Sequence, residues 1–210
     1  MSPQSWTDTL LPVLDQMRAD LGKQDPLIVA ALTSAIPQGE ATLSVRLWDD
    51  DWFVTFPDVA ICGQSGQPCP PDKQVMLLYY LTHSDGTNPA GSWIAFHDLP
   101  NGMFYAQAFQ GYSGNRLAHS FVNNVEGFER AAAVCGGQRI DIGDAAYVFW
   151  PLPRVALAAQ YWRGDDEFAP RANILFDAAA WHYLTTDGLA VLGSQLVSRL
   201  IKAPRAKYDM

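Results

Sequence analysis

The residues of this chain whose types most readily support chemistry lie between Tyr161 and Asp177, where consecutive carboxylates stand among arginine and aromatic residues. The carboxylates are Asp165, Asp166 and Glu167. Oxygen ligands of this kind suit a hard cation such as magnesium or calcium, and neighbouring carboxylates raise one another's pKa, which can produce a general acid. A solvated acidic turn is the plainer interpretation, because glycine and aspartate are typical turn residues.

One hypothesis is therefore an enzyme that uses this acidic triplet, with or without a divalent metal. Its metal ligands would be Asp165, Asp166, Glu167 and Asp177, and its catalytic residues would be Asp166, Glu167 and His97, with His119 as the alternative histidine. His97 is followed by Asp98 at the end of an apolar segment, but successive residues of a strand point to opposite faces, so the two need not touch. The remaining histidines are scattered, and a site built from them requires distant elements to meet: His83, His119 and His182.

Composition excludes several classes of function. The chain of 210 residues has a formal net charge of −8 and no cluster of Lys and Arg, which argues against nucleic-acid binding. No apolar run approaches the roughly 20 residues that a membrane-spanning helix needs. Three irregularly spaced cysteines favour a reducing compartment, so we expect a cytoplasmic protein. The glycine patterns of nucleotide-binding loops and the nucleophile signatures of common hydrolases are absent.

The elements that must position these residues follow from hydrophobic periodicity and turn signals. Helices are expected at 7–21, 26–34, 73–83, 116–121 and 126–135 and from 186 onwards, and strands at 41–47, 52–56, 58–62, 93–96, 145–150, 154–162 and 174–176. The first three strands read as an antiparallel meander. The whole chain, 1–210, is expected to form a single α+β domain with a mostly antiparallel sheet and packed helices.

A hairpin is expected where two apolar, aromatic-rich segments flank Pro151-Leu-Pro153, because proline lacks the amide hydrogen that a strand ladder needs. Both segments are too apolar for an open sheet face, so helices should cover them, with 73–83 as the chosen helix. Arg154 opens the second segment and must lie in solvent or be paired, because an unpaired buried charge is costly. Its expected partners are Asp144, Asp98 or the acidic triplet.

Several motifs together resemble an uncharacterised domain-of-unknown-function family found mainly in anaerobic bacteria and archaea. The segments that carry the resemblance are 77–81, 91–100, 104–109, 143–149, 152–155, 162–168 and 174–177. The family brings no established activity or catalytic residues. Association of some relatives with iron–sulfur and corrinoid-protein modules implies a role in cofactor handling, although this chain has no cysteine-rich segment of its own.

The resemblance and the aromatic residues within it lead to the main hypothesis, a ligand-binding or accessory protein that holds a tetrapyrrole-like or corrinoid cofactor in an aromatic cleft. The aromatic candidates are Trp93, Phe96, Tyr105, Trp150 and Trp162. Arg154 and Arg163 are expected to meet ligand carboxylates as two-pronged donors. An ordinary aromatic core is the alternative for such residues, and a protein-interaction module with exposed aromatic side chains is a further one.

Overall fold

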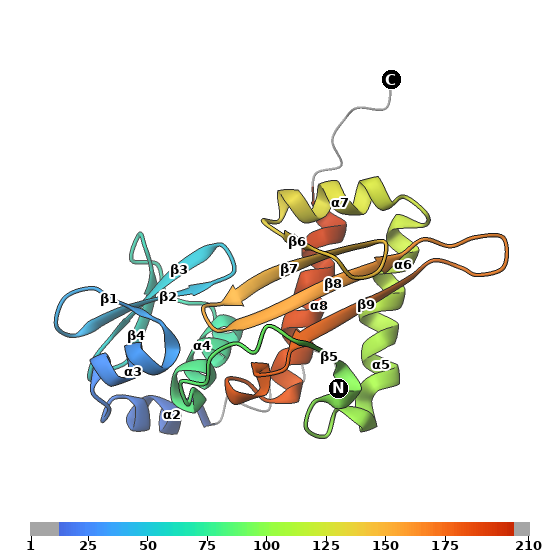
Figure 1. Ribbon diagram of the computed structural model, residues 1–210. Helices are drawn as coiled ribbons and strands as arrows, with labels where there is room; N and C mark the ends of the chain where they lie inside the picture. Colours follow the sequence, from blue (N-terminus) through green and yellow to red (C-terminus); the bar gives the residue numbers. More distant parts are fainter. Residues whose placement is uncertain (1–12, 204–210) are drawn as a thin grey trace. The chain divides into compact units, whose positions relative to one another are not determined.

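The structure of the protein, a computed structural model, describes residues 13–203. These residues divide into two compact units between which the chain passes repeatedly. Of the described residues, unit 1 contains 13–90, 150–155 and 178–189, and unit 2 contains 91–149, 156–177 and 190–203. Each unit combines helices with antiparallel strands, so the expected α+β class is confirmed (Figure 1).

Unit 1 contains a four-stranded antiparallel meander, which confirms the predicted one. Its strands run in the order β1 (Ile36–Pro37), β2 (Thr42–Leu47), β3 (Asp50–Thr55) and β4 (Ala60–Gly63). Alternate side chains of β2 form the inner face of this sheet: Leu43, Val45 and Leu47 are buried, whereas Arg46, between Val45 and Leu47, is exposed. The short strand β1 was not predicted.

The helices of unit 1 are α2 (Leu14–Leu21), α3 (Pro26–Thr33) and α4 (Pro71–His83). The predicted start of α3 is confirmed, because the Asp25 carboxylate accepts a hydrogen bond of 2.8 Å from the Leu27 amide and Pro26 occupies the first turn. Helix α4 is buried on most sides, and it packs against α2, α3 and β2. It is therefore a core helix of unit 1, and its predicted role as cover of the 145–162 hairpin stays a prediction. The expected cap at Thr7 lies outside the described residues.

Unit 2 is built on a five-stranded sheet. The strand order is β5 (Trp93–Ala95), β9 (Arg171–Asp177), β8 (Val155–Trp162), β7 (Ala145–Leu152) and β6 (Gln138–Ile140). The predicted hairpin of β7 and β8 is confirmed, with its turn at Pro153 and Arg154 because Pro151 still belongs to β7. Nearly every residue of these two central strands is buried, as the apolar sequence required.

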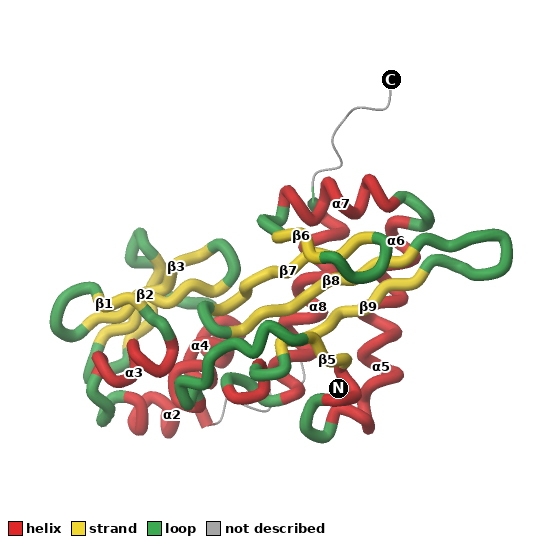
Figure 2. The backbone as a smooth tube through the Cα atoms, in the orientation of Figure 1, coloured by secondary structure: helices red, strands yellow, loops and turns green. Residues whose placement is uncertain are grey.

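The helices of unit 2 lie beside this sheet, and α5, α6 and α8 cover one of its faces (Figures 1 and 2). They are α5 (Ala106–Gln110), a π-helical turn (Gly111–Asn115), α6 (Arg116–Phe121), α7 (Val125–Val134) and α8 (Thr186–Lys202). Aromatic rings fill the interface, where Phe96 stacks on Phe109 at 4.2 Å and Phe109 lies 5.7 Å from Phe176. Within residues 13–203, no helix is long and apolar enough to cross a membrane.

Candidate functional site

A pocket of about 980 Å³ lies in unit 2, between the loop that joins β8 to β9 and the continuous helical segment α5–π-turn–α6. Its lining residues are Gln110, Asn115, Ala118, His119, Val122, Trp162, Arg163, Asp165, Phe168, Ala169, Pro170, Arg171 and Asn173. The hairpin loop extends beyond the sheet, with α6 beside its root (Figure 1). The informative 161–177 segment therefore forms one wall of this pocket.

The opposite wall depends on the π-helical turn, in which one extra residue widens the helix. A Cβ atom on Gly114 would lie 2.1 Å from the Ala172 carbonyl oxygen, so only glycine permits this approach of helix to strand. The approach lets the Gln110 side-chain amide donate to the Ala172 carbonyl at 2.9 Å and to the Asn115 side-chain oxygen at 3.1 Å. Two amide side chains are thereby fixed at the pocket wall.

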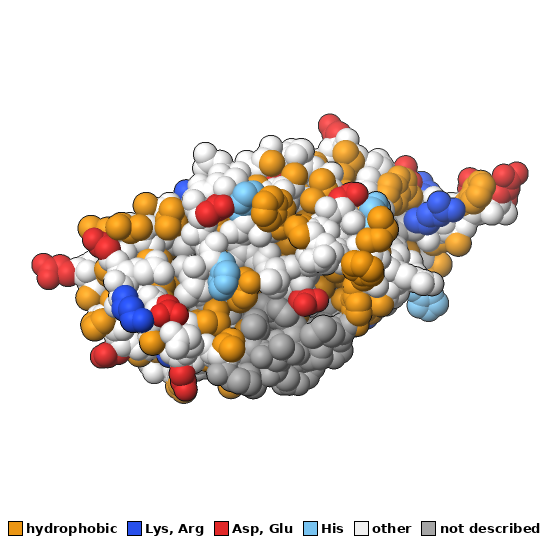
Figure 3. Space-filling view, turned by 90° about the horizontal axis from the view of Figure 1, so that it is seen from below, with side chains coloured by type: hydrophobic (Ala, Val, Ile, Leu, Met, Phe, Trp, Pro, Cys, Tyr) orange, Lys and Arg blue, Asp and Glu red, His pale blue; other side chains and the backbone are white. Residues whose placement is uncertain are grey.

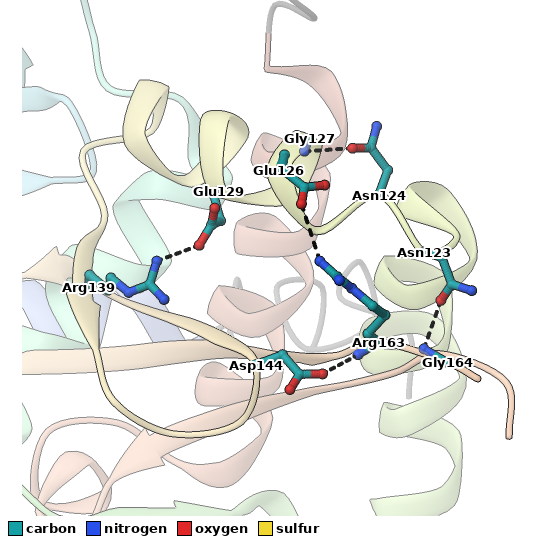
Figure 4. Close-up of polar contacts among 9 residues, drawn as sticks. All are labelled: Asn123, Asn124, Glu126, Gly127, Glu129, Arg139, Asp144, Arg163 and Gly164. Carbon is teal, nitrogen blue, oxygen red and sulfur yellow. Dashed lines mark hydrogen bonds and ion pairs between the residues drawn. The ribbon is translucent and has the colours of Figure 1, made fainter.

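The root of the β8–β9 loop is tied to its surroundings by the polar contacts of Figure 4. The backbone amide of Arg163 donates to the Asp144 carboxylate at 2.6 Å, and the Gly164 amide donates to the Asn123 side-chain oxygen at 2.7 Å. The Arg163 guanidinium also contacts the Glu126 carboxylate at 3.2 Å. The loop therefore leaves the sheet in a defined direction, and the charge of Arg163 is shared with Glu126.

The acidic triplet forms the turn at the end of this loop. The Asp165 carboxylate accepts hydrogen bonds from the backbone amides of Phe168, at 2.8 Å, and Glu167, at 2.9 Å, and these bonds lower its pKa. Asp166 and Glu167 are exposed. Acidic side chains mark the right-hand extremity of Figure 3, with basic and apolar groups just behind them. For Asp165 the plainer interpretation, a turn former, fits the geometry.

The described residues do not bring the predicted carboxylates and histidine together. Asp177 is buried at the opposite end of β9 and accepts a hydrogen bond of 2.8 Å from the Gly91 amide. A seven-residue strand spans roughly 20 Å, which separates Asp177 from the acidic turn. His97 and Asp98 do touch, with 3.4 Å between imidazole and carboxylate, but both are exposed. Among residues 13–203, no three His, Cys, Asp or Glu side chains are grouped for a metal ion.

The predicted aromatic cleft separates into different environments. Phe96 belongs to the core, and Trp93 packs against the buried cluster of Val148, Ala156 and Ala158. Tyr105 is half-buried, outside the pocket lining, and Trp150 is part of unit 1. Of the five aromatic candidates, Trp162 lines the pocket.

The predicted roles of Arg154 are corrected by its hydrogen bonds. Its guanidinium donates to four neutral oxygens of unit 1, the Ser34 hydroxyl at 2.8 Å, the Asn88 side chain at 2.9 Å, and the carbonyls of Gly86 at 3.1 Å and Ala31 at 3.2 Å. Neither the acidic triplet nor Asp144 nor Asp98 is its partner. Neutral acceptors engage all three guanidinium nitrogens, so Arg154 holds loops of unit 1 together, and its predicted contact with a ligand stays a prediction.

Arg171 was not among the predicted site residues. Its guanidinium lies 5.8 Å from the centre of the Phe168 ring, and among residues 13–203 it has no ion pair. Trp162 faces it across the β8–β9 pair. Gln110 and Asn115 were not predicted as pocket residues, and their sequence signal is the glycine-containing Gly111–Asn115 segment. His119, the alternative histidine of the enzyme hypothesis, lines the same pocket as Asp165.

The comparisons with known proteins give one family. The family model described as "Domain of unknown function (DUF3786)" matches residues 25–199, so the chain belongs to this family. No curated protein and no solved structure matches the chain. The match covers most of both units, and the resemblance found from the motifs is thereby confirmed at the level of the family.

Proposed function

We propose that this protein binds a flat, partly apolar ligand that carries carboxylate groups, and that the 980 Å³ pocket of unit 2 is its binding site. The observation that carries the proposal is the combination of Trp162 and Phe168 with Arg171, a cation without an ion pair in the described chain. Aromatic faces favour a flat apolar body, and a guanidinium pairs with a carboxylate through two parallel hydrogen bonds.

Size supports a large ligand. Pockets for small molecules and cofactors usually have volumes of about 300 to 1,000 Å³, and this one is at the upper end of that range. A tetrapyrrole-like or corrinoid compound, the class implied by the family resemblance, combines a flat apolar body with acidic or amide side chains. The side-chain amides of Asn115 and Asn173 suit such side chains as hydrogen-bond donors, whereas the Gln110 amide already donates to Ala172 and Asn115. His119, also in the lining, is of the residue type that ligates a metal at the centre of such a ring.

The test is titration of the purified full chain with haem, cobalamin and a metal-free porphyrin, followed by absorbance and by tryptophan fluorescence. A saturable response with at least one compound is expected, with weaker binding in Trp162→Ala and in Arg171→Leu. Trp150→Ala is the matched control, because Trp150 is exposed and belongs to the other unit. No saturable response with any of the three compounds would exclude this ligand class, and equal binding by Trp162→Ala would exclude this pocket.

The interaction-module alternative keeps one supporting observation. Met103 and Phe104 are 72% and 90% exposed in unit 2, and neighbouring apolar side chains of this kind often contact a partner protein. Size-exclusion chromatography of Phe104→Ser beside the unaltered chain tests it, with a change in apparent mass as the expected result. For the enzyme alternative, Asp165 and His119 line the same pocket, whereas Asp177 and His97 are not among its lining residues. A cytoplasmic location stays a prediction.

A further inference from the structure

A second and smaller pocket lies wholly within unit 1, where the C-terminal end of α4 meets the short 3-10 helix η5 (Ala180–His182). Its volume is about 270 Å³, and its lining residues are Tyr79, His83, Asp85, Trp181, His182, Leu184 and Thr185. Two histidines that seemed scattered along the sequence are therefore brought to one pocket. A carboxylate and three apolar or aromatic side chains accompany them.

His182 is held in one orientation and one tautomer. Its Nδ1 atom lies 2.6 Å from the Asp85 carboxylate, and its ring lies against Trp181 with 3.8 Å between the ring centres. Hydrogen bonds from the Thr87 hydroxyl and backbone amide lower the pKa of Asp85 to about 2, so this carboxylate is an anion at neutral pH. An anionic partner requires the proton to be on Nδ1, which leaves a lone pair on Nε2.

His83 is arranged in a similar way on the other side of the pocket. Its ring stacks on Tyr79 with 3.8 Å between centres and 4° between planes. Its Nδ1 atom lies 2.9 Å from the Thr82 hydroxyl and 3.2 Å from the Tyr79 carbonyl oxygen, so Nδ1 is engaged within α4. The pocket thus offers Nε2 of His182 as an acceptor, beside a second imidazole and the apolar surfaces of Tyr79, Trp181 and Leu184.

We propose that this pocket is a second binding site, for a small molecule with one aromatic ring and an acidic hydroxyl group, and that Nε2 of His182 takes the hydroxyl proton. Benzene fills a cavity of about 150 Å³, so a volume near 270 Å³ accommodates a single substituted ring. The O–H bond breaks with its electron pair left on the ligand oxygen, and an N–H bond forms at Nε2. The Asp85 anion stabilises the imidazolium that results.

The inference is independent of the proposed function, because its residues belong to unit 1 and those of the larger pocket to unit 2. A purely structural role for the pair, in which Asp85 and His182 only join two loops, makes a different prediction. In that case removal of either side chain lowers the stability of the protein, and the unaltered protein binds no ligand at this pocket.

The experiment titrates the full chain with 4-nitrophenol near neutral pH, slightly below the pKa of the free phenol, where the free phenol is mostly colourless, its phenolate is yellow and an ordinary imidazole is mostly neutral. A saturable yellow signal is expected with the unaltered protein. His182→Gln should weaken binding at least tenfold, and Asp85→Asn should bind the phenol with little colour, because the imidazolium has lost its anionic partner. Asp58→Asn, an exposed change in the same unit, is the control and should match the unaltered protein.

Circular dichroism and thermal melting establish that each variant is folded before it is compared. Absence of saturable binding by the unaltered protein overturns the inference, as does equal binding by His182→Gln. Colourless binding by the unaltered protein refutes the proton transfer. The binding of 4-nitrophenol is tested with variants of unit 1 and the binding of tetrapyrroles with variants of unit 2. Failure of one proposal is therefore distinguishable from failure of the other.

Discussion

Two arginines near the ends of strand β8 occupy opposite kinds of environment. Arg154 stands in the turn before β8, and its guanidinium donates to four oxygens of the fold. Arg171 is paired with Trp162 at the far end of the strand and lines a pocket, and its guanidinium lies beside the Phe168 ring without an ion pair in residues 13–203. A cation therefore indicates a binding site only when its donors are still available, and residue type alone does not distinguish the two cases.

The largest effect is expected from Arg154→Leu. The substitution leaves the Gly86 and Ala31 carbonyls and two side chains without their donor. Hydrogen bonds to a charged group contribute about 1.5–3 kcal/mol each, and less at the three exposed acceptors, where water can replace the guanidinium. We expect the free energy of unfolding to fall by about 3 kcal/mol, measured by urea denaturation, with ligand binding in the unit 2 pocket unchanged. Weaker binding without loss of stability would reverse the assignment of the two arginines.

Gly114→Ala tests the wall opposite Arg171. The added Cβ atom meets a backbone carbonyl at 2.1 Å, so helix and strand must separate, and overpacking of this kind costs about 1–3 kcal/mol. A fall of about 2 kcal/mol in the free energy of unfolding is expected, together with weaker binding at the pocket. Gly111→Ala is the matched control, because a Cβ atom there meets nothing within 4 Å. Equal stability of the two variants would show that the π-helical turn does not depend on Gly114.

Arg171→Leu is expected to change binding and leave stability almost unaltered. Loss of the guanidinium should raise the dissociation constant of a carboxylate ligand about tenfold, equivalent to about 1.4 kcal/mol. The unfolding midpoint should stay within the error of the measurement, because Arg171 has no ion pair in residues 13–203. Arg46→Leu, at an exposed arginine of unit 1 paired with Asp51, is the control for loss of positive charge. Identical affinity in both variants would remove Arg171 from the site.

The smallest effect concerns the Asp165 turn. Hydrogen bonds from the Phe168 and Glu167 amides lower the pKa of Asp165 in the folded state. Its contribution to folding stability is therefore present above the pKa of the unfolded chain, and it is lost as the pH falls through the lowered pKa of the folded state. Acid titration followed by tryptophan fluorescence should therefore show a change in the unaltered protein that is missing in Asp165→Ala. Glu167→Ala should retain the transition, because the Glu167 side chain is not the acceptor in this turn. If the unaltered protein showed no such acid transition, the turn-forming role of Asp165 would be contradicted.

Local patterns in the sequence predicted much of the fold. The Asp25–Pro26 start of α3, the β2–β4 meander and the β7–β8 hairpin depend on neighbouring residues, and all three are confirmed. The 102–115 segment was not predicted to be helical, because its glycines reduce helix propensity and its π-helical turn depends on contact with the Ala172 carbonyl. That contact joins residues far apart in the chain, and no local pattern encodes it.

The candidate site shows the same division. The sequence by itself determined the composition of the β8–β9 loop, with its carboxylates, arginines and aromatic rings, and the acidic turn formed by Asp165. Only the tertiary structure decided which of these groups remain available. In the folded chain the donors of Arg154 are bound to acceptors of the fold, and Asp177 is separated from the acidic turn by the length of a strand. His182 and Asp85, which are far apart in the sequence, are in contact. Hydrogen-bond partners between distant segments decide availability, because a donor already satisfied by the fold has little left for a ligand.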